Sequence, residues 1–247
     1  MTREPLRFSH LKRIGQSPAH YRAAVEQDGS HLLKGSAVHS VLLGGKTVIS
    51  YPGPVRRGKD WEAFQADHPE DLILSRSEID DVSGMVRAVQ SCPEAMRVLQ
   101  GVRERTVMFT LQGRECRATP DVDGGIYVTE LKTTRSSSPS RFAWDAVRHS
   151  YNGQLAWYQD ALMLQPGRRE APEAAFIVAV ESSAPYVVTV FRVAERALDQ
   201  GRRTNRLWLE TLLACEAANE WPGYSQSIVE LDLPGDEMVI GEAEEAA

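Results

Sequence analysis

The chain has 247 residues and a formal net charge of −6 at pH 7, with 42% hydrophobic and 25% charged residues. This length is sufficient for a large core, and the composition is ordinary for a soluble globular protein. The longest apolar runs, such as residues 174–180, are far shorter than the ~20 residues of a membrane helix. The first five residues lack the apolar segment of a signal peptide.

The cysteines are odd in number and scattered, at Cys92, Cys116 and Cys215. This pattern argues against a disulfide framework and against a thiolate metal site. We therefore expect a cytoplasmic protein without a membrane partner.

Charge is distributed unevenly along the chain. In the first sixty residues basic side chains outnumber acidic ones, whereas no Lys or Arg follows Arg206 and the end of the chain is acidic. This gradient is either a chance feature of solvated surfaces or a basic front that binds phosphates.

Helical signals dominate the first hundred residues. The expected helices span residues 8–14, 17–26, 34–43, 59–66, 77–91 and 93–100. Residues 45–60 form a polar loop that carries Arg56, Arg57 and Lys59, and a basic loop of this length is either disordered or functional.

The centre of the chain alternates like β-strands over residues 104–110, 114–122 and 126–133. A two-residue turn at Gly124-Gly125 would place Asp121 opposite Val128 and diagonal to Glu130. Because side chains alternate along a strand, Asp121, Glu130 and Lys132 would then share one face.

A second two-residue turn, at Gln112-Gly113, would place Glu104 directly opposite Asp121 on that face, although a slip of one residue would remove it. Carboxylates and a lysine on one face indicate a metal-dependent hydrolase, in which Mg²⁺ (or Mn²⁺) is bound by acids. The lysine would orient or deprotonate the attacking water, or stabilise the transition state. The alternative is a surface ladder of salt bridges.

After a break at residues 136–140 we expect a helix over 141–149 and a second helix, or its continuation, over 152–164. Tyr151, Gln154 and Tyr158 lie on one helical stripe. The remaining expected elements are strands at 174–181 and 186–193, a helix at 194–219 and an extended piece at 228–233. We predict one domain over residues 1–240, with a helical part to about 100, a catalytic core over about 101–195, a C-terminal helix and extension over 196–240, and a disordered acidic tail at 241–247.

Several of these segments resemble the PD-(D/E)xK nuclease superfamily, and in particular its RecE-like branch (the exodeoxyribonuclease VIII type), which is related to RecB-type and lambda-type nuclease domains. The segments that carry the resemblance follow the family's order: 35–39, Glu104, 117–121, 130–134, Tyr151…Gln154-x-x-x-Tyr158, 184–186 and 221–224. The resemblance implies an α/β (mixed α+β) fold with a restriction-endonuclease-like core. In such a core a central mixed sheet is flanked by helices, here with a helical N-terminal elaboration.

The resemblance also implies roles for individual residues. Asp121 and Glu130 would be metal ligands together with the carbonyl of Leu131, and Lys132 would be the catalytic lysine. His39 would complete the metal site, although a lone histidine among apolar neighbours is otherwise a core residue. Glu104 would support the site or be a surface acid. The remaining candidates are Gln154 and Tyr158 beside the lysine or a phosphate (Tyr158 alternatively in the core), and Ser9, Lys12, Arg56, Arg57, Lys59, Thr133 and Thr134 as contacts to the nucleic-acid backbone.

The cysteines do not supply the four ligands of the iron–sulfur members of this superfamily, so no Fe–S cluster is expected. The resemblance implies a Mg²⁺-dependent DNA exonuclease that resects linear duplex ends 5′→3′, works with a single-strand-annealing protein and assembles as a homo-oligomeric ring. Two alternatives stay open. One is a nicking or structure-specific endonuclease of the same fold, and the other is a non-catalytic DNA-binding or assembly subunit.

Overall fold

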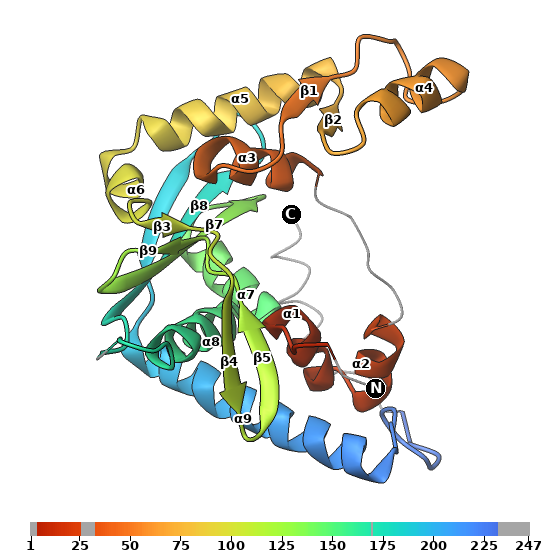
Figure 1. Ribbon diagram of the computed structural model, residues 1–247, viewed down its shortest axis with the longest axis vertical. Helices are drawn as coiled ribbons and strands as arrows, with labels where there is room; N and C mark the ends of the chain where they lie inside the picture. Colours follow the sequence, from red (N-terminus) through yellow and green to blue (C-terminus); the bar gives the residue numbers. More distant parts are fainter. Residues whose placement is uncertain (1–3, 26–32, 169, 232–247) are drawn as a thin grey trace.

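A five-stranded mixed sheet forms the centre of the computed structural model, which describes residues 4–25, 33–168 and 170–231 (Figure 1). The strand order is β3 (Val102–Arg103), β6 (Val122–Asp123), β7 (Tyr127–Thr134), β8 (Ala174–Glu181) and β9 (Val188–Arg192). Only β7 and β8 are parallel, and they pair over their full length, from Tyr127 opposite Ala174 to Thr134 opposite Glu181. The other neighbouring strands are antiparallel.

Helices cover both faces of this sheet. On one face α3 (Leu33–Leu43), α5 (Arg76–Gln90) and α6 (Pro93–Val98) pack against Leu131, Val178 and Val180. On the other face α1 (Phe8–Leu11), α8 (Tyr151–Met163) and α9 (Glu195–Ala218) pack against the side chains that alternate with these, such as Val128 and Ile177. The predicted mixed α+β fold, with a central mixed sheet flanked by helices, is confirmed.

The first hundred residues are mainly helical, as expected. The helix expected over 8–14 is divided into α1 and the 3₁₀ helix η1 (Lys12–Gly15), and the helix expected over 17–26 is α2 (Pro18–Val25). The small parallel sheet of β1 (Val48–Ser50) and β2 (Leu72–Leu74) was not predicted. Strands of three residues are too short to show a period. Together with α4 (Lys59–Asp67) they form an arm that projects at the upper right of Figure 1, so residues 45–60 are not a simple loop.

A two-stranded ribbon, β4 (Val107–Leu111) and β5 (Arg114–Ala118), turns at Gln112-Gly113. Leu111 pairs with Arg114, and both turn residues have positive φ values, 48° and 77°. These are the signs of a two-residue hairpin turn, and the prediction of this turn is confirmed. The register of the ribbon, with Val107 opposite Ala118, continues into β3 and β6, where Arg103 lies opposite Val122.

The predicted two-residue turn at Gly124-Gly125 is wrong. Asp123 pairs with Val128, and Gly124 N donates a hydrogen bond to Tyr127 O, so the turn spans residues 124–127. The cause is the buried Asp123 carboxylate, which accepts a hydrogen bond from Gly125 N and pairs with Arg168. If this register is extended by one residue beyond Val122 and Thr129, Asp121 lies opposite Glu130 and not opposite Val128. Because the register moves by two residues, the side chains keep their faces.

The second half of the chain follows the expected order of elements. α7 (Pro139–His149) and α8 are separate helices, because Ser150 between them is left-handed at φ 56° and ψ 43°. Residues 228–231 of the predicted last extended piece have no regular structure, and its remainder and the tail at 241–247 lie outside the described residues. Within the described part of the chain, no helix is both long and apolar enough to cross a membrane.

Candidate active site

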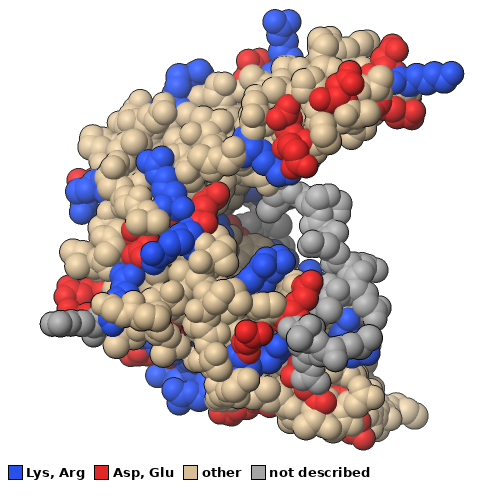
Figure 2. Space-filling view, viewed as in Figure 1, with Lys and Arg blue, Asp and Glu red and all other residues tan. Residues whose placement is uncertain are grey.

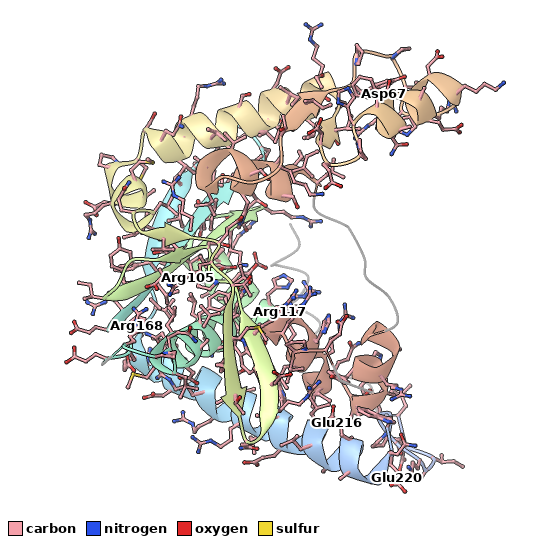
Figure 3. All side chains as sticks on the ribbon, viewed as in Figure 1. Asp67, Arg105, Arg117, Arg168, Glu216 and Glu220 are labelled. Atoms are coloured by element: carbon pink, nitrogen blue, oxygen red, sulfur yellow. The ribbon has the colours of Figure 1, made fainter. Side chains whose placement is uncertain are left out.

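An open cleft of about 840 Å³ lies between the helices that cover the two faces of the sheet, at the end of β7. Its walls come from α1, η1, α3, β7, α7 and α8, and Figure 2 shows the molecule hollowed on this side. In Figure 3 Arg117 of β5 lies beside α1 near this opening, whereas Arg105 and Arg168 lie away from it, where both contact Asp123. The cleft therefore joins segments that are far apart in the sequence.

Three possible ligand side chains meet at one end of the cleft. One donor atom each of His39, Glu104 and Asp121 lie within 4.8 Å of one another. Glu104 N donates a hydrogen bond to Asp121 O at 3.1 Å, so these two residues are opposite each other as predicted. The extended backbone conformation of β3 ends here, because Glu104 has a positive φ of 46°. The Asp121 carboxylate accepts a hydrogen bond from Leu131 N at 2.7 Å, which ties it to β7.

His39 reaches this group from α3. Its Nε2 lies 2.9 Å from the carbonyl oxygen of Leu131, and its Nδ1 lies 3.5 Å from Asp121 Oδ1. Burial lowers the pKa of His39, but the hydrogen bond and charge of Asp121, with the charge of Glu130, outweigh burial and raise it. The ring thus faces two acids and a carbonyl, although it is set on the apolar face of a buried helix.

Glu130 and Lys132 form a second group beside the first. Lys132 Nζ lies 2.6 Å from Glu130 Oε1, and Gln154 Nε2 donates to the same oxygen at 3.0 Å. Gln154 Nε2 also donates to the Tyr158 hydroxyl at 2.8 Å. Burial, and then the charge of Asp121, raise the pKa of Glu130 to about 7. Burial lowers the pKa of Lys132, but the charges of Glu130 and Asp121 outweigh burial and raise it.

The residues of these two groups fit a divalent metal ion. Glu130 Oε2 is buried and has no hydrogen-bond partner among the described residues, so one carboxylate oxygen is free for a ligand. Burial and the charge of Asp121 also raise the pKa of Glu104, which is the electrostatic cost of gathered acids that a cation would remove. Carboxylate and carbonyl oxygens suit Mg²⁺ and Mn²⁺, and an imidazole is compatible with Mn²⁺.

The predicted ligand set is brought together with one difference. Sequence reasoning paired Asp121 with Glu130, whereas the compact group contains Glu104 with Asp121 and His39. The Glu130 carboxylate is turned to Lys132 and Gln154. Asp121 lies close to both groups, and its charge therefore raises the pKa values of His39, Glu104 and Glu130.

Four of the predicted nucleic-acid contacts line the cleft, namely Ser9, Lys12, Thr133 and Thr134. Lys12 has no ion-pair partner in the part of the chain that the structure describes. Burial, and then the positive charges of Lys132 and Arg13, lower its pKa. A half-buried lysine that faces another lysine is a natural contact for an anion.

The other three predicted contacts, Arg56, Arg57 and Lys59, do not line the cleft. They belong to the arm of β1, α4 and β2, where Arg56 pairs with Glu78 and donates to Ile73 O. Charges of both signs are interspersed over this arm (Figure 2). The structure thus separates these three residues from the site.

Several residues that line the cleft were not predicted from the sequence to be site residues. They are Ser36, Ser40, Arg135, Asp145, Arg148, His149 and Tyr151. Tyr151 shares a helical stripe with Gln154, which was a usable signal. The sequence contains no comparable signal for the residues of α7, a helix that is separated from α8 by the left-handed Ser150.

Residues 7–232 match a family described as "PDDEXK-like domain of unknown function (DUF3799)". The chain belongs to this family. The match covers almost the whole chain and confirms the assignment to the PD-(D/E)xK nuclease superfamily. No curated protein sequence matches the chain.

One solved structure agrees with the fold of this PDDEXK-like protein. A protein from Eubacterium rectale described as "putative exonuclease" superposes with a TM-score of 0.66 at 14% identity, over 96% of this chain and 92% of that one. A second structure, SSO0001, has a TM-score of 0.30 at 12% identity, over 70% of this chain and 85% of that one, which is too low to indicate a shared fold. The family match supports a nuclease, a class that generally uses divalent metals, and this neighbour supports the fold.

Metal binding by the PDDEXK-like site can be measured by calorimetric titration with Mn²⁺. We expect the wild type to bind Mn²⁺, and Asp121→Asn and Glu130→Gln to weaken binding at least about tenfold, because each removes a charged ligand. Glu70→Gln is a matched control, since Glu70 is an exposed acid that lies outside the cleft. Unchanged binding by both site variants would contradict this assignment of ligands.

Proposed function

We propose that this protein is a metal-dependent deoxyribonuclease that hydrolyses linear duplex DNA from its ends. The observation that carries the proposal is the meeting of His39, Glu104 and Asp121 beside the Glu130–Lys132 pair in an open cleft. A salt-bridge ladder on a surface would not bury a carboxylate oxygen without a partner, as Glu130 Oε2 is buried here.

Asp121, Glu104, Glu130, His39 and the carbonyl of Leu131 are the proposed ligands of Mg²⁺ or Mn²⁺. Such an ion supplies a Lewis acid for the scissile phosphate and lowers the pKa of a bound water. The role of the protein is to fix the ligands. Gln154 holds Glu130 Oε1, Tyr158 holds Gln154, and Leu131 N holds Asp121.

Lys132 is the proposed catalytic lysine. Its ammonium is held 2.6 Å from Glu130 Oε1, at the boundary between the acids and the rest of the cleft. A cation there stabilises the negative charge that develops on the phosphate oxygens during hydrolysis. Ser9, Lys12, Thr133 and Thr134 line the same cleft and would contact the neighbouring phosphates of the strand.

Further parts of the proposal rest on the resemblance to RecE-like enzymes. These are the 5′→3′ polarity, the feeding of a single-strand-annealing partner and a ring-shaped homo-oligomer. The proposed cytoplasmic location rests on the composition and the scattered cysteines, and the proposed single domain over residues 1–240 on a sequence without internal repeats or a clear linker. The likeness to a "putative exonuclease" supports exonuclease action more than nicking.

The reaction can be tested by digestion of end-labelled linear duplex DNA with Mg²⁺, comparing 5′ and 3′ labels. We expect early release of the 5′ label, no digestion of closed circles, and loss of activity in Lys132→Ala with Mn²⁺ binding retained, because the lysine is not a ligand. Digestion of circles would favour the endonuclease alternative. Near-wild-type digestion by Lys132→Ala would contradict the mechanism.

The position of the basic residues gives a separate prediction about DNA binding. Lys12→Ala should weaken binding and reduce the slope of log K against log salt by about one, because one phosphate contact is lost. Lys59→Ala, on the projecting arm, should leave both quantities unchanged. Salt-dependent binding measured by fluorescence anisotropy checks the pair, and an equal effect of the two substitutions would show that the arm also contacts DNA.

A further inference from the structure

The aromatic ring of Tyr151 is a second contact of the Lys132 ammonium. Lys132 Nζ lies 4.9 Å from the centroid of this ring, within the about 6 Å over which a ring face attracts a cation. Among the described residues, the only other contact of this Nζ with a hydrogen-bonding or charged partner is Glu130 Oε1, at 2.6 Å. The ammonium is therefore held by one oxygen and one ring.

The ring is itself held in place by α7. Tyr151 is the first residue of α8 and follows the left-handed Ser150, which turns the chain from one helix into the next. His149 stacks on the Tyr151 ring at 5.5 Å and 25°, and Phe142 lies at 5.9 Å and 32°. Among the described residues the Tyr151 hydroxyl makes no hydrogen bond, so the structure uses its ring and not its hydroxyl.

A lysine in this position needs more than one contact. Its four-carbon stem is flexible and its ammonium is a point charge without a preferred direction. Glu130 Oε1 also accepts a hydrogen bond from Gln154, and a single shared oxygen does not fix the ammonium in the cleft. A ring face close to the ammonium limits the positions that it can take.

We infer that Tyr151 is a positioning residue that holds the Lys132 ammonium beside the scissile phosphate. The inference rests on the proposed nuclease function and adds a residue to its site. Tyr151 acts through Lys132, so it should affect turnover and not substrate affinity or metal binding. A residue that only packed the start of α8 would affect stability and leave turnover of the folded enzyme unchanged.

The test compares Tyr151→Leu with Tyr151→Phe on linear duplex DNA with Mg²⁺. Tyr151→Leu keeps an apolar side chain but removes the ring, and we expect kcat to fall about tenfold or more. KM should change by less than about threefold, because substrate binding is not the step affected. Tyr151→Phe retains the ring and should restore most of the lost turnover. Mn²⁺ binding, measured by calorimetry, should be the same in both variants.

Circular dichroism and thermal unfolding establish that each variant is folded. If Tyr151→Leu does not fold, Tyr151→Met removes the ring with a flexible apolar side chain and takes its place. An unchanged kcat in the ring-free variant, or an equal loss in Tyr151→Phe, would overturn the inference. An inactive wild type would instead overturn the proposed function, so the two failures are distinguishable.

Discussion

The site depends on the antiparallel register of β6 with its two neighbours, in which Val122 lies opposite Arg103 of β3 and Thr129 of β7. This register sets Glu104 against Asp121 through the hydrogen bond from Glu104 N to Asp121 O, and it brings Asp121 level with Glu130. Three acids are thereby gathered where regular strand pairing is interrupted. Like charges at this spacing disfavour ionisation, and the pKa values of Glu104 and Glu130 are raised accordingly. The fold maintains this unfavourable arrangement by burying apolar residues on both faces of β7 and β8.

The side chains around the acids divide the cleft into two parts. Glu104, Asp121 and His39 occupy one part, and Lys132, Lys12, Arg148 and His149 occupy the other together with one acid, Asp145. The Glu130–Lys132 pair lies at the boundary between them, where Gln154 and the Tyr151 ring support its two members. A phosphodiester placed across this boundary would meet the metal ligands on one side and positive charge on the other, which is what hydrolysis of a phosphate requires.

Much of this site was predictable because strand geometry preserves faces. The turn after Asp123 was predicted one residue too early, which shifts the register by two residues. Asp121, Glu130 and Lys132 nevertheless remained on one face, since a shift of two residues does not exchange the faces of a strand. The turn at Gln112-Gly113 was predicted correctly, because both residues tolerate the positive φ that it needs. α5 begins after Ser75, whose side chain caps the helix, and α6 begins at Pro93; both are local signals that a sequence shows.

Other features depended on tertiary contacts that no local pattern contains. The shifted turn at Gly125-Ile126 is accompanied by an ion pair between Asp123 and Arg168, which is far away in the sequence. The arm that separates Arg56, Arg57 and Lys59 from the cleft requires two three-residue strands to find each other across α4. The α7 residues Asp145, Arg148 and His149 line the cleft, and α7 ends at Ser150 in a left-handed conformation that its residue type does not predict.

The central claim is that one divalent ion binds where His39, Glu104 and Asp121 meet beside Glu130. Anomalous diffraction from a crystal soaked in Mn²⁺ tests it most directly. We expect an anomalous peak in contact with Asp121 and Glu104, with His39, the carbonyl of Leu131 and Glu130 Oε2 as its other protein neighbours. A crystal with Mn²⁺ bound elsewhere, and no peak at this site, would show that these residues do not form the metal site.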